Sequence, residues 1–419
     1  MKDFFEFLNN SVTEFNASLN IAEILKKEGF IYLDPSQKWD LKNGGNYYTI
    51  KDQTSVIAFK IGQKFDSKGF NIVSSHIDSP NLKVKPNGVI SSNNFTSLNT
   101  EVYGGPIFNT WFDRPLSIAG RIIISKDNKI SSKVINIDKD LLVIPNVAIH
   151  LNKDPLTNPQ KELPLASLTK YDSVQDLLKA LNIIKDEELV SFDLSVYNRN
   201  KVQLVGVNDE LFMSPRIDNL ECAYTSLKAF INANNKDKVN VYCAFNNEEV
   251  GSQTKQGAAS TILYDVLRRI VKDEELYQIN VASSVMMSAD NAHAVHPNHP
   301  EMADPTNKVF MNKGIVIKHN ANQRYTTDAI SDSIVQTICK NNDVPFQHYT
   351  NRSDQRGGGT LGSISTSQVS LITCDIGLAQ LAMHSANETS GVEDYHSMVK
   401  FLTEFYNSNF KMKDNDIEL

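Results

Sequence analysis

The chain has 419 residues, of which 41% are hydrophobic and 22% charged, a composition typical of a folded protein with about two to three domains. Its net charge of −7 and the lack of a basic cluster argue against nucleic-acid binding. There is no run of about 18 apolar residues, and Met1–Leu8 lacks the apolar core of a secretory signal. The four cysteines lack CxxC spacing, so we expect buried thiols in a cytoplasmic protein without membrane contact.

The N-terminal part predicts helices followed by strands. The predicted elements are helical residues 1–30, strands Thr54–Ile61 and Ile72–Ser75, and a turn near Asp66–Gly69. The second strand runs into His76 and Asp78. A histidine there can bind a metal, and a carboxylate two residues later can hold its other ring nitrogen or orient a neighbouring group. A lone histidine at a strand end is nevertheless more often structural, so this pair alone does not establish a metal site.

The segment between Lys85 and Phe212 has a different character. Short β-like runs dominate it, and Val174–Ile184 is its one clearly helical pattern, so we interpret it as a second domain inserted into the first. Asn109–Leu116 predicts a packed aromatic corner with a salt bridge. His150 ends a predicted strand, Leu141–Ile149, and its simplest interpretation is a surface or interface histidine.

The α/β pattern resumes at Ser214. Asp218 precedes an amphipathic helix, where its commonest role is capping. The apolar run Val239–Phe245 predicts a buried strand, and Glu248 and Glu249 follow it after two asparagines. Two like charges at a strand tip are unfavourable unless a positive group meets them. We therefore interpret one glutamate as a metal ligand and the other as a base beside the metal.

Several of these polar residues are expected to meet in one cleft. Asp290 follows an apolar run, Val281–Met287, just as His76 and the glutamate pair follow theirs. His384 precedes the predicted C-terminal helix Val392–Tyr406. Strand tips of a parallel sheet lie at one edge, so residues far apart in sequence can converge there. Imidazole and carboxylate ligands without cysteine suit catalytic zinc, manganese or cobalt. Two metals about 3.5–4 Å apart need a bridging carboxylate, for which Asp218 is suited.

Two other motifs are weaker candidates. Gly357–Thr360 lacks the Lys-Ser/Thr ending of a phosphate-binding loop, so a flexible loop is the simpler interpretation. His293, His296 and His299 resemble a metal cluster, but their spacing is irregular and we expect structural roles.

Long segments of the chain resemble the aspartyl aminopeptidase family of dinuclear zinc peptidases. The segments, in family order, are SHIDSPNLKVKP, TWFDRPL, NVAIHLN, RIDNL, NNEEVGSQTKQGA, SADNAHAVHPN, NKGIVIKHNANQRYTTDA and QLAMHSANE. The resemblance covers roughly residues 70–400. It implies a three-layer αβα metallopeptidase domain over residues 1–86 and 213–419, with a β-rich dimerisation domain inserted at 87–212.

The resemblance also implies a role for each matching residue. By that resemblance, one zinc is bound by His76, Asp218 and Asp290, and the other by Asp218, Glu249 and His384. The resemblance makes Glu248 the general base and Asp78 the carboxylate that supports His76. It also implies that His150 reaches a neighbouring subunit's site and that Lys318 meets an acidic substrate side chain. The family's glycine-rich region at 357–360 lies near the substrate, which favours a lid there.

The expected activity is removal of the N-terminal residue from short peptides, with two Zn²⁺ per subunit or Mn²⁺ or Co²⁺ in their place. The resemblance implies a dodecamer built from dimers. Two other functions stay open: a non-catalytic binding or assembly module on the same scaffold, and a related amidohydrolase acting on N-acyl amino acids. The intact Glu248 and the complete ligand set argue against the first of these.

Overall fold

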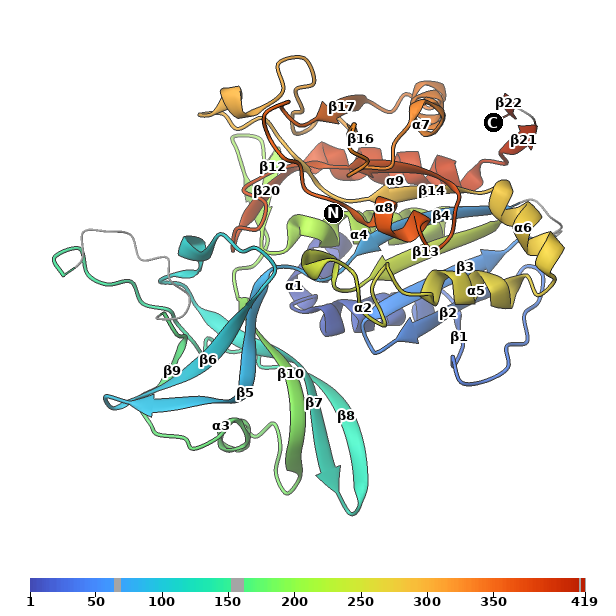
Figure 1. Cartoon of the computed structure of the whole chain (residues 1–419). Helices are drawn as coiled ribbons and strands as arrows, with labels where there is room; N and C mark the ends of the chain where they lie inside the picture. Colours follow the sequence, from blue (N-terminus) through green and yellow to red (C-terminus); the bar gives the residue numbers. More distant parts are fainter. Residues whose placement is uncertain (64–68, 152–161, 414–415, 419) are drawn as a thin grey trace.

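The structure, a computed structural model, describes residues 1–63, 69–151, 162–413 and 416–418. Helices flank a large sheet in one part of the molecule, and a second sheet projects away from it (Figure 1). The turn predicted near Asp66–Gly69 falls largely outside the described residues. Among the described helices, none combines the length and apolar character that a membrane span requires.

The large sheet has nine strands, and its central strands are parallel. In spatial order the strands are β1 (Ile31–Tyr32), β2 (Asn46–Lys51), β3 (Ser55–Ile61), β13 (Val239–Phe245), β4 (Phe70–His76), β14 (Val285–Ala289), β18 (Ile372–Gly377), β16 (Ile315–His319) and β17 (Phe346–Thr350). Every residue of β4, β13 and β14 is buried, as expected for strands covered on both faces. Because these strands are parallel, their carboxyl ends lie at one edge.

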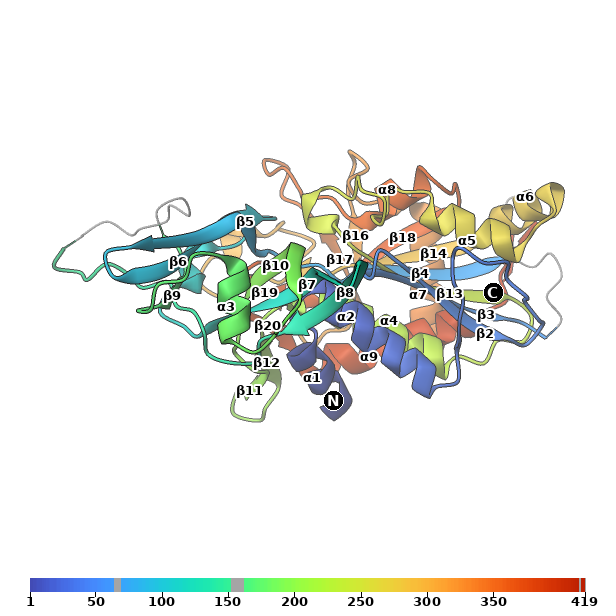
Figure 2. The ribbon, with the colours of Figure 1, turned by 90° about the horizontal axis from the view of Figure 1, so that it is seen from below.

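Helices cover both faces of this sheet, which gives the predicted three-layer αβα arrangement (Figure 2). One face carries α1 (Lys2–Asn10), α2 (Glu14–Lys27), α4 (Ile217–Asn232), α7 (Ala329–Asn341) and α9 (Val392–Asn407). The other carries α5 (Ile262–Ile270), α6 (Glu274–Ala282) and α8 (Leu361–Thr366). The segment from Gln256 to Thr261, which leads into α5, consists of turns and bends.

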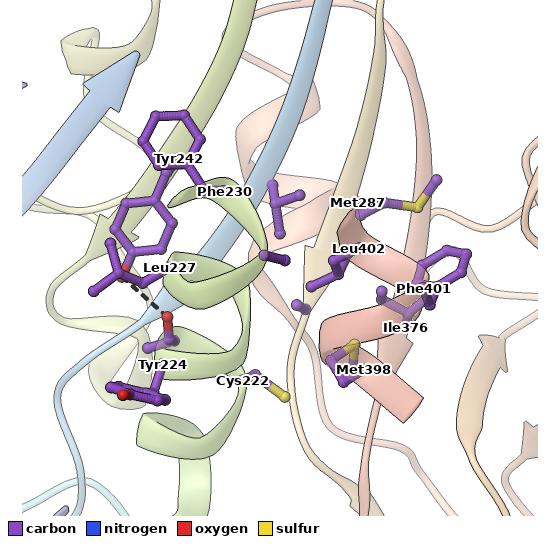
Figure 3. Close-up of a cluster of buried hydrophobic side chains, with 14 of the residues drawn as sticks. Cys222, Tyr224, Leu227, Phe230, Tyr242, Met287, Ile376, Met398, Phe401 and Leu402 are labelled. Carbon is purple, nitrogen blue, oxygen red and sulfur yellow. Dashed lines mark hydrogen bonds between the residues drawn. The ribbon is translucent and has the colours of Figure 1, made fainter. Parts of the chain in front are cut away.

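The hydrophobic core on the α4–α9 face packs these helices against the central strands of the sheet. Figure 3 shows Leu227 and Phe230 of α4 beside Tyr242 of β13, and Met398 and Phe401 of α9 beside the central strands. The Tyr242 hydroxyl donates a hydrogen bond of 3.1 Å to the Ala223 carbonyl, so its polar end is satisfied within the core. This packing fixes α4, and with it the loop that carries Asp218, against the sheet.

The projecting sheet is antiparallel and has six strands. In spatial order they are β8 (Lys129–Asn136), β7 (Leu116–Lys126), β10 (Glu188–Asn198), β5 (Asn81–Ser92), β6 (Phe95–Tyr103) and β9 (Leu165–Ser167). Its hydrophobic core includes α3 (Val174–Ala180), which ends earlier than predicted, and residues of the 3-10 helix η1 (Phe108–Trp111). Phe108 and Phe112 pack edge to face, as the predicted aromatic corner requires, whereas the described contacts of Asp113 are with Asn146 rather than Arg114.

A smaller sheet of five strands adjoins these two parts of the chain. Its order is β11 (Gln203–Val205), β12 (Leu211–Ser214), β20 (Glu388–Gly391), β19 (Ala379–Leu381) and β15 (Ala292–His293). A C-terminal pair, β21 (Lys411–Lys413) and β22 (Asp416–Glu418), and the 3-10 helices η2 (Glu248–Val250) and η3 (Pro300–Met302) complete the described elements. The inserted β-rich region was predicted at 87–212, whereas the six-stranded sheet starts at Asn81.

The strand predicted over Leu141–Ile149 is wrong. Only isolated bridges form there, at Leu142 and Val143, and His150 lies in a turn. Pro145 explains the difference, since it lacks the backbone N–H that a strand ladder needs. Asn146 instead makes backbone and side-chain hydrogen bonds to the Asp113 carboxylate, at 2.9 and 2.6 Å.

Candidate active site

Polar side chains gather at the carboxyl edge of the parallel strands. His76 is the last residue of β4, Glu248 and Glu249 follow β13 in η2, and Asp290 follows β14. Asp218 enters from the start of α4, where its backbone is not helical. Within the described residues no side chain caps α4, so the capping role considered for Asp218 is not realised.

One group of side chains surrounds His76. Its Nε2 lies 3.4 Å from Asp218 Oδ1 and 3.9 Å from Asp290 Oδ1. These three residues are buried, and their potential ligand atoms lie within 4.8 Å of one another. The Glu248 Oε2 atom is also 3.9 Å from His76 Nε2, so a metal there would have this carboxylate beside it.

A second group surrounds His384 and shares Asp218 with the first. His384 Nε2 lies 3.4 Å from Asp218 Oδ2 and 3.4 Å from Glu249 Oε2. Asp218 therefore faces one imidazole with each of its oxygens. A carboxylate placed in this way is arranged as a bridge between two neighbouring cation positions.

The outer nitrogens of both histidines have backbone acceptors. His76 Nδ1 lies 3.0 Å from the carbonyl oxygen of Asp78, and His384 Nδ1 lies 3.0 Å from that of Gly105. Because a carbonyl can only accept, the hydrogen of each imidazole in its neutral form lies on Nδ1, which leaves the Nε2 lone pair to bind a cation. This is the usual way in which a metal-binding imidazole is oriented.

Asp78 positions the two glutamates. Its carboxylate accepts hydrogen bonds from the backbone N–H groups of Glu248 and Glu249, both at 3.2 Å. It also accepts a 2.6 Å bond from the Tyr103 hydroxyl and lies 3.4 Å from His76 Nδ1. Although Asp78 is fully buried, these donors outweigh the cost of burial and hold its pKa below the usual range. A single ionised side chain thus ties η2 to the end of β4.

The side chains of the cluster are crowded with negative charge. Burial and the neighbouring carboxylates raise the pKa of Glu248 to about 8 and also raise the pKa of Glu249. Burial likewise raises the pKa of Asp290, although Lys318 opposes this. For Asp218, burial is outweighed by the neighbouring imidazoles of His384 and His76, which lower its pKa. Such crowding is relieved when divalent cations are bound.

The donor set fits metal ions with a preference for nitrogen and oxygen ligands. Asp218 Oδ1 and Glu249 Oε1 are buried and have no hydrogen-bond partner among the described residues. Buried carboxylate oxygens without a donor are unfavourable unless a cation meets them. Imidazoles and carboxylates without a thiolate match catalytic zinc and related ions.

The cluster opens into a cavity of about 810 Å³. Lys318 lies in its wall with only 3% of its surface exposed, so it is not a solvated surface lysine. Its Nζ donates to the Asn291 carbonyl at 2.7 Å and lies 3.9 Å from Asp290 Oδ1. Gly358, Gly359 and Thr360 also line the cavity, in agreement with the expected position of that loop near the substrate.

Some sequence candidates lie elsewhere. His150 is exposed and does not line the cavity of its own chain. His293 lines the cavity, whereas His296 and His299 pack against each other outside it. A second cavity, of about 860 Å³, lies beside Trp39 and α5; lysines and arginines dominate its described lining, which includes no histidine.

Three contributors were not predicted from the sequence. Tyr103 comes from β6 of the six-stranded sheet, and Gly105 follows on the same chain segment. Glu388 is buried and accepts hydrogen bonds from the backbone N–H groups of Asp218 and His384, at 3.0 and 2.7 Å. Only Glu388 offered a signal, because it ends the segment QLAMHSANE that also contains His384.

Comparisons with known proteins point to one family. The profile of the family described as "Aminopeptidase I zinc metalloprotease (M18)" matches residues 7–406. A relative from Clostridium novyi (strain NT), named "Probable M18 family aminopeptidase 2", is 41% identical over 420 residues, covering 96% of this chain and 97% of the relative.

Solved structures show the same fold. The chain resembles a protein in the "Cryo-EM structure of the Ape4 and Nbr1 complex" with a TM-score of 0.92 and 34% identity, covering 97% of this chain and 85% of that one. It also resembles the "Structure of S. cerevesiae mApe1 dodecamer", with a TM-score of 0.85 and 26% identity over 97% and 95% of the two chains. The chain therefore belongs to the M18 family of zinc aminopeptidases and is a metallo-aminopeptidase.

Proposed function

We propose that the enzyme uses two divalent metal ions, zinc in the first place and manganese or cobalt as substitutes, to remove acidic N-terminal residues from short peptides. The observation that carries the proposal is the shared carboxylate of Asp218, which lies 3.4 Å from an imidazole nitrogen on each side. His76 and Asp290 complete one ligand group, and Glu249 and His384 complete the other.

Glu248 is the proposed general base. Two bound ions would supply a water nucleophile at neutral pH and polarise the scissile carbonyl. The Glu248 carboxylate takes the proton of the attacking water and returns it to the leaving amine. Its side chain is largely buried but 16% exposed, and burial raises its pKa to about 8. Cations bound beside it would favour the ionised form, which accepts the proton. Asp78 holds its backbone in place.

The proposed acidic preference rests on Lys318. A substrate carboxylate in the cavity would meet its buried ammonium group, and a charge-assisted hydrogen bond contributes about 1.5–3 kcal/mol. The closest described carboxylate is that of Asp290, at 3.9 Å, which leaves donors of the ammonium free for a substrate.

We also propose that the region at 87–212 forms a dimer interface and that dimers build a dodecamer. An exposed His150 in this region supports its proposed role in a neighbouring subunit's site, where it would donate to the developing oxyanion. The similar fold of the mApe1 dodecamer from S. cerevesiae supports the assembly. A cytoplasmic location is proposed because all four cysteines are free and buried.

A substrate panel tests the proposed activity. The metal-reconstituted enzyme is assayed with aminoacyl reporters carrying each N-terminal residue and, in parallel, with N-acyl amino acids. We expect turnover only of free amino termini, fastest for Asp and Glu. Turnover of the N-acyl compounds alone would identify an amidohydrolase, and no turnover with full metal content would indicate a binding or assembly module.

A further inference from the structure

A second group of metal-binding side chains lies outside the catalytic cavity. His319 ends β16, His348 belongs to the edge strand β17, and Asp332 lies in the first turn of α7. Each offers a ligand atom within 4.8 Å of the others, and all three are half-buried. None of them lines the catalytic cavity.

The strand register separates this group from the catalytic site. Lys318 pairs with Tyr349, and both line the catalytic cavity. Side chains alternate between the two faces of a strand, so the neighbouring residues His319 and His348 face the other side. That side is the α7 face, where Ile317 packs in the same core as Ile334.

The distances within the group match those of the catalytic ligands. His319 Nε2 lies 3.5 Å from Asp332 Oδ2, and His348 Nε2 lies 3.3 Å from Asp332 Oδ1. The equivalent nitrogen–oxygen distances around Asp218 are 3.4 Å on each side. Tetrahedral zinc with bonds of about 2.0–2.1 Å places its ligands about 3.3–3.4 Å apart. Each nitrogen–oxygen pair therefore has the spacing of two ligands of one ion, and one ligand atom from each of the three residues lies within 4.8 Å of the others.

The surroundings favour coordination. Gln336 donates through Nε2 to both Asp332 oxygens, at 3.1 and 3.2 Å, and so fixes the carboxylate. The side chains of His319 and His348 keep 30% and 34% exposure, which leaves an approach for an ion from solvent.

We propose that His319, His348 and Asp332 bind one divalent transition-metal ion of the zinc or copper class, in addition to the catalytic metals. Two imidazoles and one carboxylate leave a fourth position for water. The ion would join the edge strand β17 to β16 and to the start of α7. Its absence would leave the catalytic ligands in place, since no residue is shared between the two sites.

Copper binding to the zinc-loaded holoenzyme tests this site. One equivalent of Cu²⁺ per chain is added, released zinc is monitored, and the electron paramagnetic resonance spectrum is recorded. We expect a single species with hyperfine coupling to two imidazole nitrogens. His319→Gln and His348→Gln should each remove one nitrogen and weaken Zn²⁺ binding at this site by at least ~10-fold in calorimetry.

The control variant is His296→Gln, because His296 and His299 form the other exposed histidine pair among the described residues, with ring centroids 4.9 Å apart. It should leave copper and zinc uptake unchanged. Asp332→Asn keeps the side-chain shape and should also weaken metal binding at this site. Circular dichroism and light scattering check that each variant is folded and assembled. An unchanged spectrum in both His319→Gln and His348→Gln, a signal lost in His296→Gln, or no uptake by the wild type would overturn the proposal.

Discussion

At the scale of single residues, the active site depends on a few side chains that each orient several others. Asp78 contacts the backbone of both glutamates and the outer nitrogen of His76. Glu388 holds the backbone of Asp218 and His384 in the same way. The proposed ligands are thus fixed before any ion is bound, which favours tight binding and a defined geometry.

Asp78→Asn should weaken both activity and metal binding. The amide keeps the shape but loses the charge and brings an NH₂ group toward backbone N–H donors. We expect ~10–100-fold lower metal affinity or kcat/KM, the usual result of losing a group that orients a ligand. Metal titration with a chelator measures it. Tyr103→Phe removes only one of the donors to Asp78 and should lower metal affinity and activity by a smaller factor. Metal affinity and activity of Asp78→Asn equal to those of the wild type would contradict the positioning role.

Lys318→Ala should change substrate preference. Loss of a charge-assisted bond worth about 1.5–3 kcal/mol predicts that the ratio of kcat/KM for Glu over Leu substrates falls about 10- to 100-fold. Lys318→Arg keeps the charge and should retain part of the preference. Metal content is checked in both, because Lys318 lies 3.9 Å from Asp290 Oδ1. An unchanged ratio in Lys318→Ala would remove this residue from the account of specificity.

At the scale of elements, parallel strand order brings distant residues to one edge. The proposed ligands His76, Glu249 and Asp290 could be predicted from the sequence because each lies at or within four residues of the end of an apolar run, and the tips of parallel strands converge. Tyr103 and Gly105 were not readable in this way. They reach the site through the packing of a separate sheet, and Gly105 contributes only a backbone carbonyl that no sequence pattern marks.

The prediction over Leu141–Ile149 failed for a local reason. The run is apolar, but Pro145 interrupts the ladder and Asn146 bonds to Asp113 instead. The strands of the inserted region are harder to predict from the sequence than those of the catalytic part. Antiparallel strands with one solvated face, such as β8, carry few apolar residues. Hydrophobic runs therefore locate the buried parallel strands better than the projecting sheet.

A buried lysine beside β13 predicts a pH dependence of stability. Lys238 is 1% exposed, and burial lowers its pKa from 10.5 to about 8. Between these pH values the unfolded chain keeps a proton that the folded chain releases, so the free energy of unfolding should rise with pH by on the order of 1–3 kcal/mol. Urea unfolding at fixed protein concentration measures this rise.

Lys238→Met should reduce that rise and increase stability at pH 7, while Lys60, whose pKa burial also lowers to about 8, contributes the remainder. Lys236→Met is the matched control, since Lys236 is exposed in the same loop and its substitution should leave the pH dependence unchanged. A slope in Lys238→Met as steep as in the wild type would show that Lys238 does not contribute to it.

At the scale of the whole molecule, the site described in one chain has no oxyanion donor from His150. Light scattering should show an assembly far above the 46.9 kDa of one chain. Glu248→Gln and His150→Ala subunits should each be inactive alone. Mixed under conditions that allow exchange, they should regain partial activity, because some sites then combine an intact Glu248 with an intact His150. A fully active monomer, or mixtures that stay inactive despite demonstrated exchange, would exclude a shared site.

In the proposed mechanism Glu248 is the general base, whereas its neighbour Glu249 is a metal ligand. The most direct test is to measure metal content and kcat together in Glu248→Gln and Glu249→Gln. Glu248→Gln should keep two metal ions per chain and lose at least ~10²-fold in kcat, the usual scale for loss of a general base. Glu249→Gln should lose affinity at one metal position. Near-normal turnover by Glu248→Gln, or loss of a metal ion from it, would contradict the account.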